Sequence, residues 1–191
     1  MSVFNNVTEM NGQIVAKNWI EWDHFFIPNN PESLRSMLKI LMMLLGHCGS
    51  CLALDCCYFI DSKRPENPLH NHCHCNLLSI SEYQVKGIGS AECSIEKFTK
   101  YIFAEGSSSK GKKELFQNFG FPISDEDYLK QLYETQALKK YILGDYELNV
   151  LDNFGQRINI KIVLNGNEIN TGWMVEPNGK IRNTTPFGGW V

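Results

Sequence analysis

The hydrophobic positions near the start of the chain follow the period of an α-helix. Between residues 34 and 45, leucine and methionine recur at every third or fourth position, so they share one face of a helix. Asn30 and Pro31 suit the beginning of this helix, and Gly46 suits its end. The apolar face, including its methionines, predicts a helix that fills part of a hydrophobic core.

Further helical patterns stand in the middle of the chain. Ser94 suits the cap of a helix over 95–103, and a short helix is predicted over 112–119. A longer one is predicted over 124–141, where Ser124 and Asp127 have the spacing of a capping box.

From residue 146 the hydrophobic residues alternate with polar ones, which is typical of strands with one buried face. Tyr146, Leu148 and Val150 are expected to face one way, as are the isoleucines and leucine at 158, 160, 162 and 164. Turn sequences separate the strands at 152–155, 165–166 and 177–179. The predicted class is α+β, with two helices packed on an antiparallel β-meander of about four strands.

The first ninety residues are less regular. The aromatic run 19–27 predicts a strand or edge segment over the core, with a partner-binding patch as the alternative. A short pair of strands is expected within 52–60. The chain of 191 residues has room for one large domain or two small ones. We therefore expect an N-terminal module over 1–90 and a C-terminal domain over 91–191.

Composition narrows the classes of protein that fit. The net charge of −3 argues against a bulk electrostatic grip on nucleic acid. The sequence shows no secretory pattern, and its most apolar segment, 38–45, is too short to span a bilayer. The seven cysteines are an odd number, which favours metal binding over a disulfide framework. We expect a soluble cytoplasmic protein with no membrane partner.

Two clusters of cysteine and histidine have the spacing of a zinc site. Cys48 and Cys51 form a CxxC pair, and a second cluster follows within the next 25 residues. The second cluster contains His70, Cys73 and Cys75, with either cysteine available as the fourth ligand. Four Cys or His ligands fill the tetrahedron of a structural zinc ion, so we expect structural Zn²⁺ rather than a catalytic metal. The alternatives are metal-free thiols or a disulfide, and His72 and His74 have no assigned role.

Catalysis in the C-terminal half would have to work without histidine or cysteine, because neither occurs after Cys93. Arginine and lysine can stabilise the charge of a phosphoryl transition state, so a metal-independent ribonuclease is one candidate. The weak candidates for its catalytic residues are Arg157, Lys180, Arg182 and Thr185. The alternative is that these side chains are simply the outward positions of a half-buried sheet. The consecutive His70, Asn71 and His72 do not match the arrangement of HNH nucleases.

The runs Cys48–Asp55 and Pro68–Cys75 resemble the closing zinc knuckle of Mu F-like phage head-morphogenesis proteins, over about residues 46–76. The resemblance rests on the cysteine pairs, Asp55 and the Pro-Leu-His sequence. Cys56 and His74 depart from it, and the large helical body of those proteins is absent here.

Residues 98–188 resemble an uncharacterised bacterial domain found at the C-termini of phage head proteins and toxin-like polypeptides. The resembling runs are Lys110–Gly120, Tyr146–Leu148, Asn153–Ile158, Gly172–Val175, Pro177–Ile181 and Thr185–Phe187. No catalytic residue follows from this resemblance.

Together the two resemblances imply a toxin-like effector that is associated with a phage or prophage. It would act in the cytoplasm or be delivered with a phage particle. RNA or an immunity or partner protein would be its target. The rival interpretation is a non-catalytic structural or interaction module stabilised by zinc. A third places an enzyme site between the halves, at His24, His47 or His72. The sequence leaves the choice between enzyme and binding module open.

Overall fold

The computed structural model describes residues 7–10, 13–16, 19–23, 32–44, 46, 48–67, 69–71, 73, 75–79, 89–104 and 111–189. It confirms the α+β class. In chain order the helices and strands are β1 (Val7–Met10), β2 (Gln13–Ala16), β3 (Trp19–Asp23), α1 (Glu32–Leu44), α2 (Gly49–Leu54), β4 (Tyr58–Ile60), β5 (Asn76–Ser79), β6 (Ser90–Glu92), α3 (Lys112–Asn118), α4 (Glu126–Leu143), β7 (Glu147–Asp152), β8 (Gly155–Leu164), β9 (Asn167–Glu176) and β10 (Lys180–Thr185). No helix among these described residues is long and apolar enough to cross a membrane.

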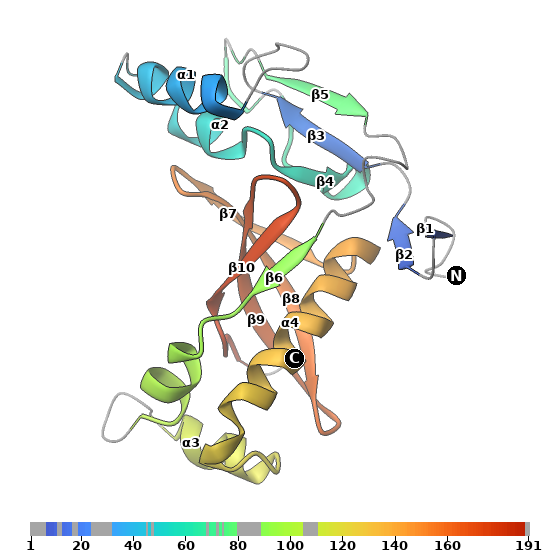
Figure 1. Ribbon diagram of the computed structural model, residues 1–191, viewed down its shortest axis with the longest axis vertical. Helices are drawn as coiled ribbons and strands as arrows, with labels where there is room; N and C mark the ends of the chain where they lie inside the picture. Colours follow the sequence, from blue (N-terminus) through green and yellow to red (C-terminus); the bar gives the residue numbers. More distant parts are fainter. Residues whose placement is uncertain are drawn as a thin grey trace.

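The larger sheet has the strand order β6-β10-β9-β8-β7 (Figure 1). Its last four strands form the predicted antiparallel meander, and β6 is an addition that pairs with β10 in parallel. Asn165 and Gly166 both adopt positive φ in the β8–β9 turn, and Asn178 and Gly179 do so in the β9–β10 turn. Such pairs favour tight hairpins, because their twist matches that of the strands.

Helix α4 covers one face of this sheet. Its buried residues are Leu129, Tyr133, Ala137 and Tyr141, and the facing positions of β8 are Ile158, Ile160, Ile162 and Leu164, all fully buried. The alternation predicted for β8 is therefore confirmed. The opposite face of the sheet carries the polar positions of β8 and β9, including Arg157, Asn159 and Asn170. An antiparallel sheet commonly has one such solvated face.

The N-terminal part forms a second, three-stranded sheet with the order β4-β3-β5. Its central strand, β3, buries Trp19 and Trp22, so the expectation of a strand in the aromatic run is correct for 19–23. Residues 24–27 of that run lie outside the described residues. This sheet lies at one end of the larger sheet (Figure 1). The backbone N–H of Asn178 donates to the carbonyl of Cys56 (2.9 Å), and one hydrophobic cluster contains residues of both parts.

The predicted boundary at residue 90 falls at the start of β6, which belongs to the larger sheet. The division into two domains stays a prediction.

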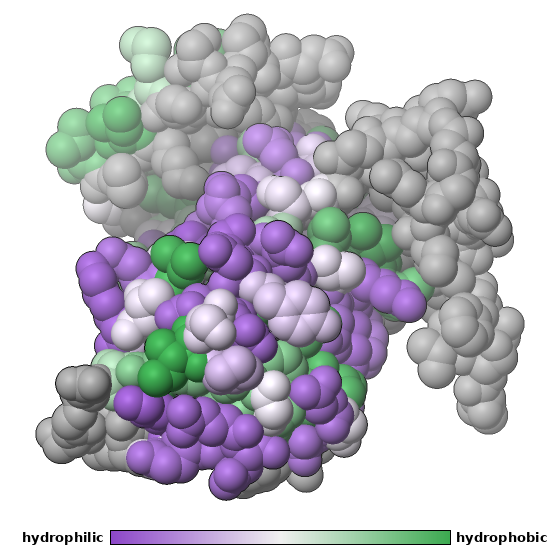
Figure 2. Space-filling model, turned by 60° about the horizontal axis from the view of Figure 1, so that its bottom comes forward, coloured by the Kyte–Doolittle hydropathy of each residue, from purple (hydrophilic) through white to green (hydrophobic). Residues whose placement is uncertain are grey.

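The expectation that the apolar face of α1 fills the core is wrong. Met37 is 68% exposed and Leu44 is 79% exposed, and Leu34, Ile40 and Leu41 are also exposed. Figure 2 shows hydrophobic atoms gathered at its upper left, in the region of α1. The period of the sequence specified an amphipathic helix, but a pattern of this kind does not say which surface will cover the apolar face.

Three further local expectations are corrected. Of the strand pair expected within 52–60, residues 52–54 instead belong to helix α2 and only 58–60 forms a strand. Ser124 lies in a 3₁₀ turn and makes no capping bond to α4, whose first residue is Glu126. Leu148 and Val150 are exposed on β7, which is an edge strand of the sheet and whose register with β8 shifts between Leu148 and Leu151. The helix predicted over 95–103 is confirmed over 96–102, where Phe98–Ile102 is π-helical, and Ser94 Oγ accepts from the N–H of Glu96 (3.3 Å).

Candidate metal centre

Helix α2 brings the two cysteines of the CxxC pair to one side. Cys48 stands immediately before the helix and Cys51 lies in its first turn. The N–H of Leu52 donates to the carbonyl of Cys48 (3.2 Å), which fixes this turn. Residues three apart on a helical turn lie side by side, so both thiols are available to one ion. The sequence predicted the pair but not the helix that orients it.

The second group of ligands comes from residues 69–75. A turn forms where the N–H of Cys73 donates to the carbonyl of His70 (3.2 Å). The Nδ1 atom of His70 lies 2.7 Å from the carbonyl oxygen of Asn71, a hydrogen bond that places the proton on Nδ1. The Nε2 atom is then free to act as a ligand, and metal-binding histidines commonly donate their other ring N–H to a carbonyl in this way.

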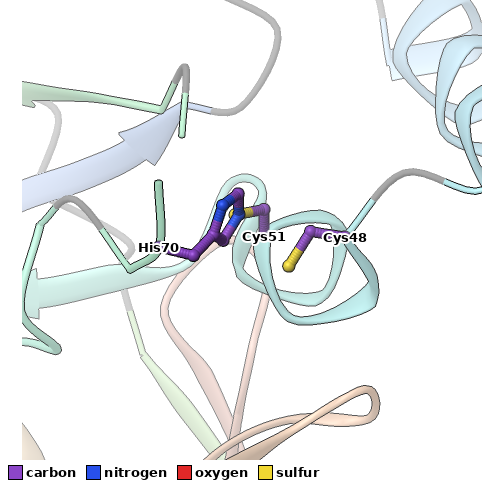
Figure 3. Close-up of side chains that lie close together, drawn as sticks. All are labelled: Cys48, Cys51 and His70. Carbon is purple, nitrogen blue, oxygen red and sulfur yellow. The ribbon is translucent and has the colours of Figure 1, made fainter. Parts of the chain in front are cut away.

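The two groups meet at Cys51. Its Sγ atom lies 3.1 Å from His70 Nε2 and 3.7 Å from Cys73 Sγ. Figure 3 shows Cys48 and Cys51 on one turn of α2 and the ring of His70 facing them from a separate segment of the chain. The potential ligand atoms of Cys48, Cys51 and His70 lie within 4.8 Å of one another, as do those of Cys51, Cys73 and Cys75.

All five predicted ligands are therefore brought together, and the arrangement can hold a metal ion. All seven cysteines are free thiols, so no disulfide competes. His24, His47, His72 and His74 lie outside the described residues.

Burial divides the thiols into two kinds. Cys51 is 1% exposed and Cys75 is 8% exposed. Burial raises the pKa of both thiols, that of Cys75 to about 11. At Cys48 burial also opposes ionisation, but the backbone amides of Cys51 and Ser50, contact with the Cys51 side chain and the charge of His70 together lower the thiol pKa. At Cys73 burial raises the thiol pKa, but the backbone amides of Cys75 and Leu69 and the neighbouring thiols outweigh it and lower the pKa overall.

Trp22 is a contributor that sequence reasoning missed. Its indole Nε1 is buried and has no hydrogen-bond partner of ordinary geometry among the described residues. The indole is nevertheless near enough to the Cys75 thiol to lower its pKa, which opposes the larger effect of burial. Cys75 reaches this position because it directly precedes β5, whose Leu77 pairs with Trp22. Only the strand pairing relates these two residues, so the sequence carried no signal for it.

The remaining cysteines lie outside the cluster. Cys57 and Cys93 are buried, as expected for core thiols. Burial raises the pKa of Cys93 to about 12, and the charge of Glu134 adds to this effect. Cys56 is only partly buried and adopts a positive φ of 61°.

The catalytic candidates of the C-terminal half are divided between two places. Lys180 and Arg182 surround Glu176, and Lys180 also lies 2.9 Å from Glu92. Arg157 pairs with Asp152 at 3.2 Å. Arg157 and Thr185 line one polar hollow in the face of the larger sheet that is opposite α4. Lys180 and Arg182 do not line it. The four side chains thus do not form one catalytic cluster.

Comparison with known proteins found no matching family model, no matching curated protein and no matching solved structure. The resemblance to phage proteins stays an expectation drawn from the sequence.

Proposed function

We propose that this protein is stabilised by one structural Zn²⁺ ion, which joins α2 to the segment 69–75. The proposal rests on one observation: five Cys and His ligand atoms, from two separate segments of the chain, lie close to Cys51. Thiolates and a neutral imidazole are the ligands that structural zinc sites use.

We assign Cys48, Cys51, His70 and Cys73 as the four ligands, and the distance between Cys51 and Cys73 supports the choice of Cys73. In a tetrahedral site with zinc–sulfur bonds of about 2.3 Å, two ligating sulfurs lie roughly 3.8 Å apart. The Sγ atoms of Cys51 and Cys73 already lie 3.7 Å apart. Cys75 then remains a buried fifth thiol beside Trp22. Because four protein ligands leave no open position, the role of the ion is structural.

The ion would stabilise the N-terminal sheet. Residues 69–75 lead directly into β5, and α2 leads into β4, so both outer strands of the sheet β4-β3-β5 would be fixed at the site. Structural zinc contributes on the order of 10 kcal/mol to the folding of small domains.

The test is elemental analysis of the purified full chain. We expect about one zinc per chain, and we expect Cys51→Ser to lose it while Cys93→Ala keeps it. Absence of any bound metal after purification from zinc-supplemented cells would refute the proposal. So would a thermal stability that a strong chelator leaves unchanged.

For the biological role we propose a phage- or prophage-associated effector, as the sequence resemblance implies, with RNA as its target. The ribonuclease would act at the polar hollow that Arg157 and Thr185 line, where an RNA phosphate would have to replace Asp152 as the partner of Arg157. Expression of the full chain in bacteria should then arrest growth and fragment cellular RNA, and Arg157→Ala should relieve both. Growth arrest without RNA breakdown would exclude the ribonuclease.

The alternative is a non-catalytic interaction module stabilised by zinc. The exposed apolar residues of α1, such as Met37 and Leu44, support this alternative. A folded, zinc-loaded chain that causes neither arrest nor RNA breakdown would favour it.

A further inference from the structure

The polar face of the larger sheet, opposite α4, contains a hollow of about 230 Å³. We call it the polar hollow; it is lined by Asn149, Arg157, Asn159, Asn170, Thr171, Gly172, Thr184, Thr185 and Gly188. A water molecule occupies about 30 Å³ of liquid, so the polar hollow has room for a small molecule. A second hollow of about 100 Å³ adjoins it and shares Asn159 and Asn170.

Two features of the backbone create the polar hollow. Gly172 has no side chain at the centre of β9, and a Cβ atom there would lie 3.1 Å from Thr184 Oγ1 and 3.2 Å from Thr185 Cβ. The register between β9 and β10 shifts between Asn183 and Thr185. Successive residues of a regular strand face opposite sides, but this irregularity lets both Thr184 and Thr185 line the polar hollow.

Several hydrogen-bonding groups in the wall have no protein partner. Among the described residues, no hydrogen bond engages the side chains of Asn170, Thr184 or Thr185. The amide of Asn149 donates to Asn159 Oδ1 (3.0 Å), which orients the Asn159 amide and leaves its nitrogen free to donate. The wall therefore offers amides and hydroxyls that can donate and accept within a small volume.

The charges at this place are compensated. Arg157 pairs with Asp152 at 3.2 Å, and Lys161 in the adjoining hollow lies 3.8 Å from Glu168. The adjoining hollow also contains Lys63, Asp145 and Glu147. A phosphate site requires cations that carboxylates do not already neutralise. An uncharged ligand with several hydroxyl groups fits better, because each hydroxyl both donates and accepts a hydrogen bond.

We propose that the polar hollow binds a neutral saccharide, with Asn159, Asn170, Thr184 and Thr185 hydrogen-bonded to the hydroxyl groups of one sugar ring. The Arg157 guanidinium, held by Asp152, would contribute a further donor at the rim. This site is independent of the zinc ion and does not require the chain to cleave RNA.

The experiment is binding of the zinc-loaded full chain to a broad printed array of neutral glycans, followed by titration calorimetry with the best free oligosaccharide. Adenosine and uridine serve as a second set of probes, because ribose also carries neighbouring hydroxyls. We expect saccharide binding, at least a tenfold loss of affinity in Asn170→Ala, and loss of binding in Gly172→Val, whose side chain would fill the floor.

Val163→Thr is the matched control, since Val163 is exposed on β8 but does not line either hollow. It should bind as the unaltered chain does. Because Gly172→Val could unfold the sheet, Asn170→Ala must show an unchanged melting temperature for its loss of affinity to count. Absence of glycan binding, binding that neither variant affects, or binding of the nucleosides alone would each overturn the saccharide proposal. The last result would instead support RNA as the ligand of this site.

Discussion

The Sγ atom of Cys51 lies 3.7 Å from the Sγ atom of Cys73, 22 positions further along the chain. This separation matches the edge of a zinc–thiolate tetrahedron, roughly 3.8 Å. Cys75 lies in the same neighbourhood but is deeper, against the indole of Trp22.

We predict that Cys73→Ser weakens zinc binding by roughly 100-fold or more, whereas Cys75→Ser keeps one zinc per chain. A ligating sulfur cannot be replaced by a hydroxyl without losing a metal–thiolate bond, but a thiol outside the tetrahedron can. Competition with a coloured chelator measures both affinities. The reverse ranking would assign the fourth position to Cys75.

Zinc affinity should increase with pH between 6 and 8. Burial raises the pKa of the Cys51 thiol, so this thiol is protonated in the metal-free protein and must release its proton on binding. The carbonyl of Asn71 and the nearby thiolates raise the pKa of His70, so at the acidic end of this range the imidazole must also lose a proton. Each released proton changes the affinity by about tenfold per pH unit. Falling pH therefore weakens binding; an affinity that stays constant over this range would contradict the assignment of Cys51 as a ligand.

The cysteines should differ in their reaction with iodoacetamide. Cys48 and Cys73 are partly exposed and have lowered pKa values, whereas Cys93 is 2% exposed with a pKa of about 12. Because the thiolate is the nucleophile, we expect the first two to react about 100-fold faster in the metal-free chain. Added zinc should protect them and leave Cys93 unchanged. Peptide mass spectrometry measures each site, and equal labelling with and without zinc would count against a metal site.

Tyr141 joins the two sheets and should be important for stability. Its hydroxyl, at the end of α4, donates to the carbonyl of Tyr58 in β4. Tyr141→Phe would remove this hydrogen bond between α4 and β4, so the free energy of unfolding should fall by about 0.5–1.5 kcal/mol. Tyr128→Phe is the matched control, because Tyr128 is 57% exposed and its ring stacks on Phe121, a contact that phenylalanine retains. Urea denaturation compares the two. A similar, small effect for both variants would show that the hydroxyl contributes little.

Much of the C-terminal fold was predictable because its signals are local. The alternation of Ile158, Ile160 and Ile162 specifies one buried face, and Asn165 with Gly166 specifies a hairpin turn. Strand β6 was not predictable, because three residues carry no usable periodicity and its parallel pairing with β10 joins positions about ninety residues apart. The exposure of Met37 was missed for a related reason: a helical pattern identifies an apolar face without identifying its partner.

The sequence by itself determined the α+β class, the meander and the five candidate ligands, since each depends on spacing along the chain and on the chemistry of individual side chains. Only the tertiary structure decided that Cys51 stands at the centre of the ligands, that Trp22 lies against Cys75, and that Gly172, Thr184 and Thr185 open a hollow in the sheet. These relationships depend on strand register and on the packing of distant segments. Both result from the burial of the whole core, and no short stretch of sequence contains them.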